Sequence, residues 1–163
     1  HVESFGLQIG TWLASAYLES EGLDVAALQP RTRRHIQLGR WASRAGLTRP
    51  GPRDAWRERS IGFFADHSVD LLLTPALATA PPPADGFSTG TWRHSMAVNV
   101  RYAPYAAPWN VAGLPAIVIP VGLRPDGLPV AIQLVGPPDS ELLLLAVAGQ
   151  FEVLNPWQRH AFA

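Results

Sequence analysis

Two apolar segments in the C-terminal part of the sequence constrain the fold more strongly than any other feature. Residues 116–123 and 129–135 have the length and composition of β-strands, and Arg124-Pro125-Asp126-Gly127 lies between them. Proline presets φ for a turn and glycine accepts a positive φ, so the pattern predicts a β-hairpin. Apart from Gln133, both strands are apolar on both faces, and we therefore expect other elements to cover both faces of the sheet.

Apolar residues at helical spacing predict helices on either side of the hairpin. Pro50-Gly51-Pro52 is expected to break the chain between two of them, and Trp41 is expected among the apolar residues of the second helix. The predicted ranges are 5–18, 30–46, 53–67 and about 139–155.

The last predicted helix begins beside Asp139, whose carboxylate can cap free N–H groups. Its predicted buried stripe consists of Leu142, Leu145, Ala146 and Val153. Gly149 falls on the same face and would allow another element to approach closely.

The remaining stretches complete an α/β chain. Residues 70–75 predict a short buried strand that a proline stops, and 76–93 predict a long loop rich in Pro, Gly, Ser and Thr. Residues 97–111 have some helical character, which two prolines interrupt. We expect one unit of helices around a small mixed sheet, with residues 1–68 mainly helical and 69–163 holding the strands, the long loop, the hairpin and the last helix.

Composition excludes several classes of function. The formal net charge is zero, which argues against a nucleic-acid-binding protein, and no apolar run is long enough to cross a membrane. There is no cysteine, and the five histidines lack metal-ligand spacing, so we expect no metal and no cofactor. Asp66, His67 and Asp70 are close in sequence, but successive side chains of a helix point to different faces, so we do not expect them to form a metal site. A cytoplasmic location fits a chain without cysteine.

Several short motifs in a fixed order resemble the C-terminal part of amidase-signature hydrolases. The resemblance covers about residues 69–157, and it implies that the small sheet belongs to a larger amidase-signature sheet. It also implies hydrolysis of small-molecule amides without a metal. The motifs are Asp70 to Pro75, Trp109-Asn110, Gly113-Leu114-Pro115-Ala116, Gly127-Leu128-Pro129, Gln133-Leu134-Val135-Gly136 and Pro156-Trp157.

The resemblance also implies chemistry that this sequence cannot hold. The family uses a Ser, a cis-Ser and a Lys, and all 13 basic residues here are arginine. No Gly-Ser-Ser-Gly stretch occurs, and Ser88-Thr89-Gly90-Thr91 is rejected as a substitute. We expect a piece of a longer protein, inactive alone, whose catalytic residues precede His1 and whose N-terminal half is its partner. The alternative is a non-catalytic scaffold or binding module with the same fold.

The family resemblance places candidate substrate-binding residues just before and at the matched asparagine. They are Tyr102, Tyr105, Trp109 and Asn110, and the aromatic ones favour an apolar acyl group. Tyr105 and Trp109 suit core packing equally, and a buried Asn110 would more often tie backbone groups. Glutamine-hydrolysing relatives carry an acidic residue where this chain has Ala103, which argues against that branch.

Two further expectations concern single residues and surfaces. Gln133 is expected to be a satisfied amide of the core or its rim and not a catalytic group. Strands that are apolar on both faces need partners, so we expect the chain alone to expose an apolar surface and to self-associate through it.

Overall fold

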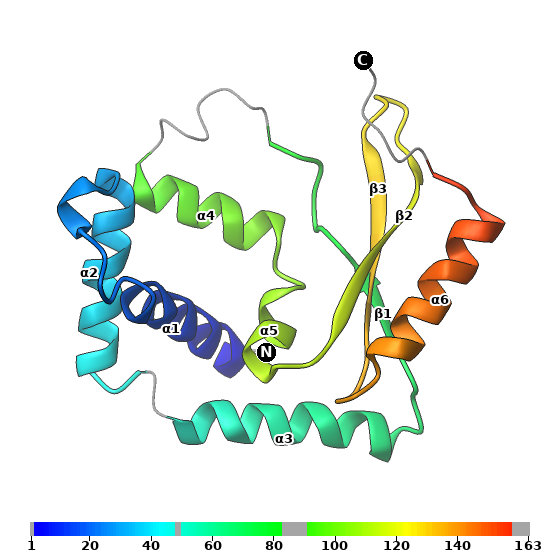
Figure 1. Ribbon diagram of the computed structural model, residues 1–163, viewed down its shortest axis with the longest axis horizontal. Helices are drawn as coiled ribbons and strands as arrows, with labels where there is room; N and C mark the ends of the chain where they lie inside the picture. The colour runs from blue at the N-terminus through cyan, green and yellow to red at the C-terminus, as the bar shows by residue number, and fades with distance from the viewer. Residues whose placement is uncertain (1, 48–49, 83–90, 158–163) are drawn as a thin grey trace.

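The structure, a computed structural model, describes residues 2–47, 50–82 and 91–157 (Figure 1). The elements run from N- to C-terminus as helices and strands of an α/β chain, which confirms the predicted class. They are α1 (Val2–Leu18), a short 3-10 turn (Val25–Ala27), α2 (Pro30–Arg44), α3 (Pro50–Asp66), β1 (Leu72–Pro75), α4 (Trp92–Tyr102), α5 (Ala107–Ala112), β2 (Ala116–Leu123), β3 (Pro129–Val135) and α6 (Glu141–Leu154).

The predicted hairpin forms β2 and β3 with the predicted bounds. β1 pairs with the other edge of β3, so the strand order is β1-β3-β2, and every pairing among the described strands is antiparallel. The larger mixed sheet therefore stays a prediction. A register shift between Pro120 and Gly122 marks a bulge, which fits a proline that cannot donate to the ladder.

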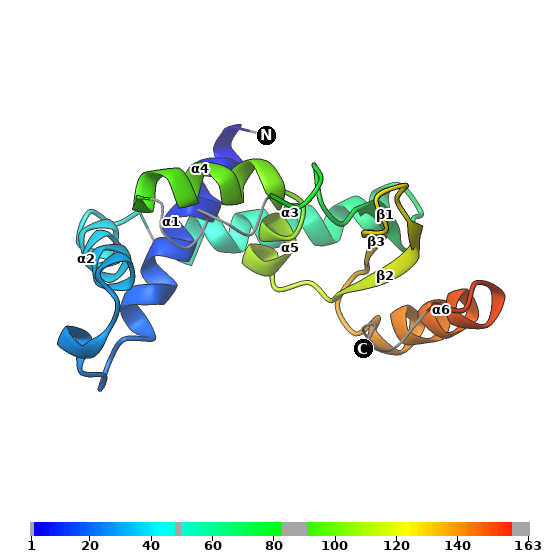
Figure 2. The ribbon, with the colours of Figure 1, turned by 90° about the horizontal axis from the view of Figure 1, so that it is seen from above.

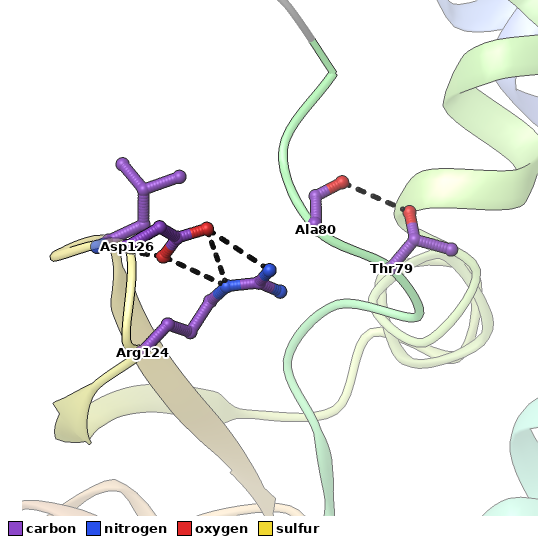
Figure 3. A network of polar contacts seen from close by, with 5 residues as sticks. Thr79, Ala80, Arg124 and Asp126 are labelled. Atoms are coloured by element: carbon purple, nitrogen blue, oxygen red, sulfur yellow. Dashed lines mark hydrogen bonds and ion pairs between the residues drawn. The ribbon is translucent and has the colours of Figure 1, made fainter.

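The hairpin turn is closed by backbone bonds and one exposed ion pair. The Gly127 N–H donates to the Arg124 carbonyl at 2.9 Å, and Gly127 takes a positive φ of 81°. Figure 3 shows the Arg124 guanidinium pointing at the Asp126 carboxylate, 3.1 Å away. The hydrogen bond from the Arg124 side chain holds the pKa of the Asp126 carboxyl below its usual value. The turn chemistry that predicts the hairpin is thus present in the structure.

Helices cover both faces of the sheet, although unevenly. Figures 1 and 2 show α1, α2 and α4 gathered at one end of the molecule, the sheet and α6 at the other, and α3 running between them. Leu134 packs with Leu144 of α6, whereas its neighbour Val135 packs with Phe64 of α3. Successive strand residues thus reach different clusters, as the two-residue period requires. Val118 and Leu123 remain exposed.

Helix α3 holds the short helix α5 by bonding to its C-terminal carbonyls. Arg53 Nε donates to the Val111 carbonyl at 3.1 Å, and Arg57 donates to the carbonyls of Ala112 and Gly113 at 2.6 and 2.8 Å. These groups lack intrahelical partners, and cations are favoured at the negative end of a helix. The Trp56 indole N–H adds a bond of 2.9 Å to the Pro108 carbonyl.

Prolines set two helix boundaries, and the sequence-based ranges missed one of them. The break expected at Pro50-Gly51-Pro52 is wrong, because α3 begins at Pro50 and the first turn of a helix needs no proline N–H. The stretch of helical character over 97–111, with its expected interruption by proline, is two helices, α4 and α5, separated around Pro104. α4 begins at Trp92, where the Thr91 hydroxyl accepts the His94 N–H.

The predicted cap of α6 is also wrong. Asp139 has a φ of 66° and lies before the N-cap residue, which is Ser140. The Ser140 hydroxyl donates to the Pro137 carbonyl and does not cap the helix. The helix start is therefore fixed by this turn and not by an aspartate cap.

The predicted buried stripe of α6 is the exposed one. Leu142, Leu145 and Val153 are 81%, 60% and 78% exposed, whereas Leu144 is buried against Ile119 and Leu134. Phe151 packs with the same cluster. Trp41, an apolar residue of α2, is likewise 61% exposed. α6 thus carries apolar residues on the face that contacts the sheet and on the face that does not.

Helices α1 and α2 approach closely at a glycine. A Cβ on Gly39 would overlap the backbone carbonyl oxygen of Leu13 and lie 3.0 Å from the Tyr17 Cβ. Gly149 in α6, by contrast, has nothing within 4 Å of an added Cβ. One helical glycine is therefore required by packing, and the other is not required by contacts of this chain.

We expect Gly39→Ala and Gly149→Ala to change stability in opposite directions. Gly39→Ala forces two backbones apart and should lower the free energy of unfolding by about 1–3 kcal/mol. Gly149→Ala should raise it by about 0.5–1 kcal/mol, because alanine favours the helix and meets no atom. Urea unfolding followed by circular dichroism measures both. Equal effects of the two changes would show that the helix crossing does not depend on Gly39.

Candidate functional site

An apolar hollow lies where α1, α4 and α5 meet. We call it the apolar pocket; its volume is about 330 Å³, near the lower end of ligand pockets in proteins. Small side chains of the α4–α5 segment leave the space, and larger apolar groups wall it. The residues that matter for the argument are Ile9, Met96, Val100, Ala103, Ala106 and Asn110.

Local sequence positions each wall of the apolar pocket. Met96, Val100 and Ala103 recur at intervals of four and three residues, so α4 presents them on one face. Pro104 prevents α4 from continuing, and the link that follows turns the chain into α5. Because α3 fixes α5 through its terminal carbonyls, Asn110 is held at the pocket wall.

The predicted substrate residues do not all reach this pocket. Asn110 lines it, together with Ala103. Trp109 is partly buried against the core cluster around Phe64. Tyr102 and Tyr105 are also partly buried, and each uses its backbone carbonyl to hold another segment. The part that these residues take in substrate binding stays a prediction.

The surroundings of Asn110 decide one alternative. The prediction that Asn110 is buried and ties backbone groups is wrong. The residue is exposed, and its side chain has no hydrogen-bond partner in the described part of the chain. An amide that is exposed at a pocket rim can donate to and accept from a ligand. Asn110 is therefore the predicted residue that the geometry supports best.

Gln133 is the satisfied amide that the sequence predicts. It is 2% exposed, and its Nε2 donates to the Thr74 hydroxyl and to the Tyr105 carbonyl, each at 3.2 Å. One side chain thus connects β3 to β1 and to the α4–α5 link. Its amide nitrogen is thus used within the protein and holds the link that borders the pocket.

A second hollow, which we call the histidine pocket, adjoins the apolar pocket. Its volume is about 380 Å³, it lies between α1, α2 and α4, and it shares Trp12, Met96 and Asn99 with the first. His35 lies between two indoles, with ring centroids 4.1 Å from Trp12 and 6.1 Å from Trp92. The sequence-based interpretation missed this pocket, because its walls are remote in sequence.

A hydrogen bond fixes the form of His35. The Trp92 indole N–H donates to His35 Nδ1 at 3.2 Å, which requires an unprotonated Nδ1. Burial lowers the pKa of His35, and a backbone hydrogen bond with Trp12 opposes this in part. The neutral imidazole is therefore the form that joins α2 to α4.

The described residues hold no group of three or more His, Asp or Glu side chains that could bind a metal ion. His1, His160 and Ser88 to Gly90 lie outside the described residues. Among the helices of the described ranges, none has the length and apolar character that a bilayer-spanning segment requires.

Comparisons with known proteins agree on one family. Residues 21–145 match the family model described as Amidase. The putative amidase AmiA2 of Mycobacterium tuberculosis (strain CDC 1551 / Oshkosh) is 36% identical over 135 residues, which cover 82% of this chain and 28% of that protein. A glutamyl-tRNA(Gln) amidotransferase component from Synechococcus sp. (strain CC9902) is 35% identical over 148 residues, which cover 88% of this chain and 28% of that protein.

A solved structure shows the same fold over a larger molecule. The 6-aminohexanoate cyclic dimer hydrolase matches with a TM-score of 0.71 and 22% identity, covering 93% of this chain and 35% of that one. The chain thus spans about 28% of the length of the curated relatives named above.

The pKa of His35 predicts a loss of stability in acid. Since folding lowers this pKa, the folded state prefers the neutral ring, and the stabilisation is complete above the unfolded pKa of about 6.5. It is lost as the pH falls through the folded pKa. Between about pH 7.5 and about pH 5, the native chain should lose more unfolding free energy than His35→Gln, which does not titrate. Parallel losses in urea titrations of both proteins would contradict a role for His35.

Proposed function

Because this chain belongs to the amidase-signature family, we propose that it forms the C-terminal part of a cytoplasmic amidohydrolase that cleaves small carboxylic-acid amides. The observation that carries the proposal is the apolar pocket at Asn110. Its α4 and α5 walls lie within the stretch that matches the family model, and it joins an apolar lining to an exposed amide. This combination suits a ligand with an apolar acyl group and a polar amide bond.

The catalytic groups would come from residues outside this sequence. A serine hydroxyl is a weak nucleophile until a base takes its proton, and a lysine can act as that base only when its surroundings deprotonate it. The sequence has no lysine, so it cannot supply a Ser–cis-Ser–Lys set by itself. In this proposal the chain shapes the acyl pocket, and the rest of the protein holds the nucleophile and the oxyanion donors.

The lining of the apolar pocket favours an uncharged acyl group. Ala103 offers no carboxylate to a substrate ammonium group, and Asn110 supplies a neutral amide. Tyr102, Tyr105 and Trp109 do not line the pocket of the described chain. Their proposed contact with substrate requires walls that the rest of the enzyme would contribute.

The exposed apolar face of α6 supports a missing partner. Leu142, Leu145 and Val153 are well exposed, and Gly149 on this helix leaves room for a closely packed neighbour. We propose that the preceding part of the same protein covers this face. Without it, the chain would self-associate through α6 and the exposed strand residues.

The rival function is a non-catalytic scaffold or binding module. The missing lysine supports it as far as this sequence reaches. The residues that precede this sequence in its gene distinguish the two proposals, because a lysine followed by a Gly/Ser-rich segment supports the enzyme.

We expect the 163-residue chain alone to be inactive and self-associated, and the chain joined to its preceding residues to be active and of defined size. The reason is that only the longer protein holds the nucleophile, its base and the cover for α6. A panel of aliphatic and aryl amides measures activity, and sedimentation measures size. If the short chain hydrolysed amides and a serine-directed inhibitor abolished this activity, the proposal that the catalytic groups lie outside this sequence would be refuted. Inactivity of the longer protein would favour the scaffold.

In that longer protein, we expect Ala103→Leu to change selectivity. Filling the pocket should lower kcat/KM for an aryl amide relative to acetamide by about 10–100-fold, because only the larger acyl group needs the space. Ala97→Leu on the exposed side of α4 is the matched control and should leave the ratio unchanged. An unchanged ratio for Ala103→Leu, with normal folding, would mean that the acyl group binds elsewhere.

A further inference from the structure

The aromatic wall of the apolar pocket comes from α1. Ile9 and Trp12 are three residues apart, so both lie on the face of α1 that lines this pocket. The Trp12 side chain is 43% exposed, which leaves much of its indole open to a ligand. Among the described residues that line the pocket, Trp12 is the aromatic one, and it precedes the stretch that matches the family model. The family motifs therefore gave no sign of it.

His35 contacts Trp12 from the side of the histidine pocket. The two rings meet edge to face, with centroids 4.1 Å apart and planes inclined at 75°. His35 also forms a hydrogen bond with the Trp12 backbone, and its Nδ1 accepts the Trp92 indole N–H at 3.2 Å. One imidazole thus connects α1, α2 and α4, and it fixes the helix that carries the indole.

An indole at this wall affects which acyl group fits the apolar pocket. Met96, Val100 and Ala103 line the pocket from α4, so a flat ring can pack against the α4 side chains and the indole together. An acetyl group fills little of the pocket volume of about 330 Å³ and gains little from the indole. The wall therefore favours a flat aromatic acyl group.

We propose that Trp12 is a specificity-determining residue of the apolar pocket and that His35 is the positioning residue that holds its indole at the wall. The proposal rests on the proposed amidase function and names the acyl group that this pocket selects, an uncharged aromatic ring. The neutral imidazole is the form that holds Trp12, because a proton on Nδ1 would break the hydrogen bond from Trp92.

Benzamide and acetamide test the role of Trp12 in the longer protein. Trp12→Ala should lower kcat/KM for benzamide relative to acetamide by about tenfold to a hundredfold, because only the larger acyl group reaches the indole. Trp12→Phe keeps a smaller ring and should lower the ratio by about twofold to fivefold. Trp41→Ala is the matched control and should leave the ratio unchanged, since this tryptophan is 61% exposed and lines neither pocket.

The variant Ala103→Leu separates failure of this proposal from failure of the proposed function. If Ala103→Leu changes the ratio and the Trp12 variants do not, the pocket stands and the role of Trp12 is overturned. Trp12→Phe decides the question alone if Trp12→Ala does not fold. If the longer protein hydrolyses no amide, or if Ala103→Leu also leaves the ratio unchanged, the proposed function or its pocket has failed, and this proposal fails with it.

The role of His35 is tested by the pH dependence of the same ratio. Both amides are uncharged and use the same catalytic groups, so the titration of those groups cancels in the ratio. Since burial lowers the pKa of His35, the ratio should be constant above about pH 7 and fall as the pH falls through the folded pKa, below about 6.5. Among the described residues that line the histidine pocket, α2 contributes one charged side chain, Arg31, which keeps its charge over this range, and α1 and α4 contribute none.

Matched variants separate positioning by His35 from a purely structural role. His35→Ala should lower the ratio at about pH 7.5 by about threefold to tenfold. His35→Gln, whose amide oxygen can accept the Trp92 N–H, should restore part of this loss and make the ratio independent of pH. His94→Gln, at an exposed position of α4, is the control and should keep the pH dependence of the unaltered protein. An unchanged ratio in His35→Ala, or a pH dependence that persists in His35→Gln, would overturn the positioning role.

Discussion

The contact between α3 and the end of α5 is the interaction on which the rest of this structure depends. α5 has six residues, too few for a stable isolated helix, and its last carbonyls have no partners within it. Arg53, Trp56 and Arg57 recur at helical spacing; the two arginines donate to those last carbonyls, and the Trp56 indole donates to the Pro108 carbonyl. The chain leaves this fixed end through Gly113, in a left-handed conformation, and enters β2. The start of the sheet and the wall of the apolar pocket are therefore set by one group of charge-assisted hydrogen bonds.

Local chemistry was sufficient to predict the hairpin and insufficient to orient the last helix. The bounds of β2 and β3 follow from apolar runs that a Pro-Asp-Gly turn separates, and these signals lie within a few residues of one another. α6 contains Leu142 to Leu145 in a row, so apolar residues occur on every side of the helix. Periodicity cannot choose between two apolar faces. The packing of Leu144 against β2 and β3 makes the choice, and this packing is a long-range contact.

The candidate site shows the same limit. Asn110 could be found from a motif, because its neighbours in sequence are also its neighbours at the turn into β2. Trp12, Ile9 and Met96 carried no local signal of a pocket, since α1 and α4 meet only after the chain has folded. The prolines of this stretch predicted the interruption between α4 and α5. They did not indicate which face of each helix would line a pocket. Short-range rules thus predict elements and turns, whereas cavities arise from distant surfaces that fit imperfectly.

Gln133 limits the registers in which β3 can pair with its neighbouring strands. It is the polar residue of an otherwise apolar strand, opposite Thr74 on one side and Val118 on the other. A slip of β3 by one residue would turn its amide toward the apolar cluster of Leu144 and leave the Tyr105 carbonyl facing Leu134. Such a one-residue slip would bury an unpaired amide, at a cost of about 1–3 kcal/mol. A single glutamine therefore opposes a one-residue slip of a strand whose other residues are apolar on both faces.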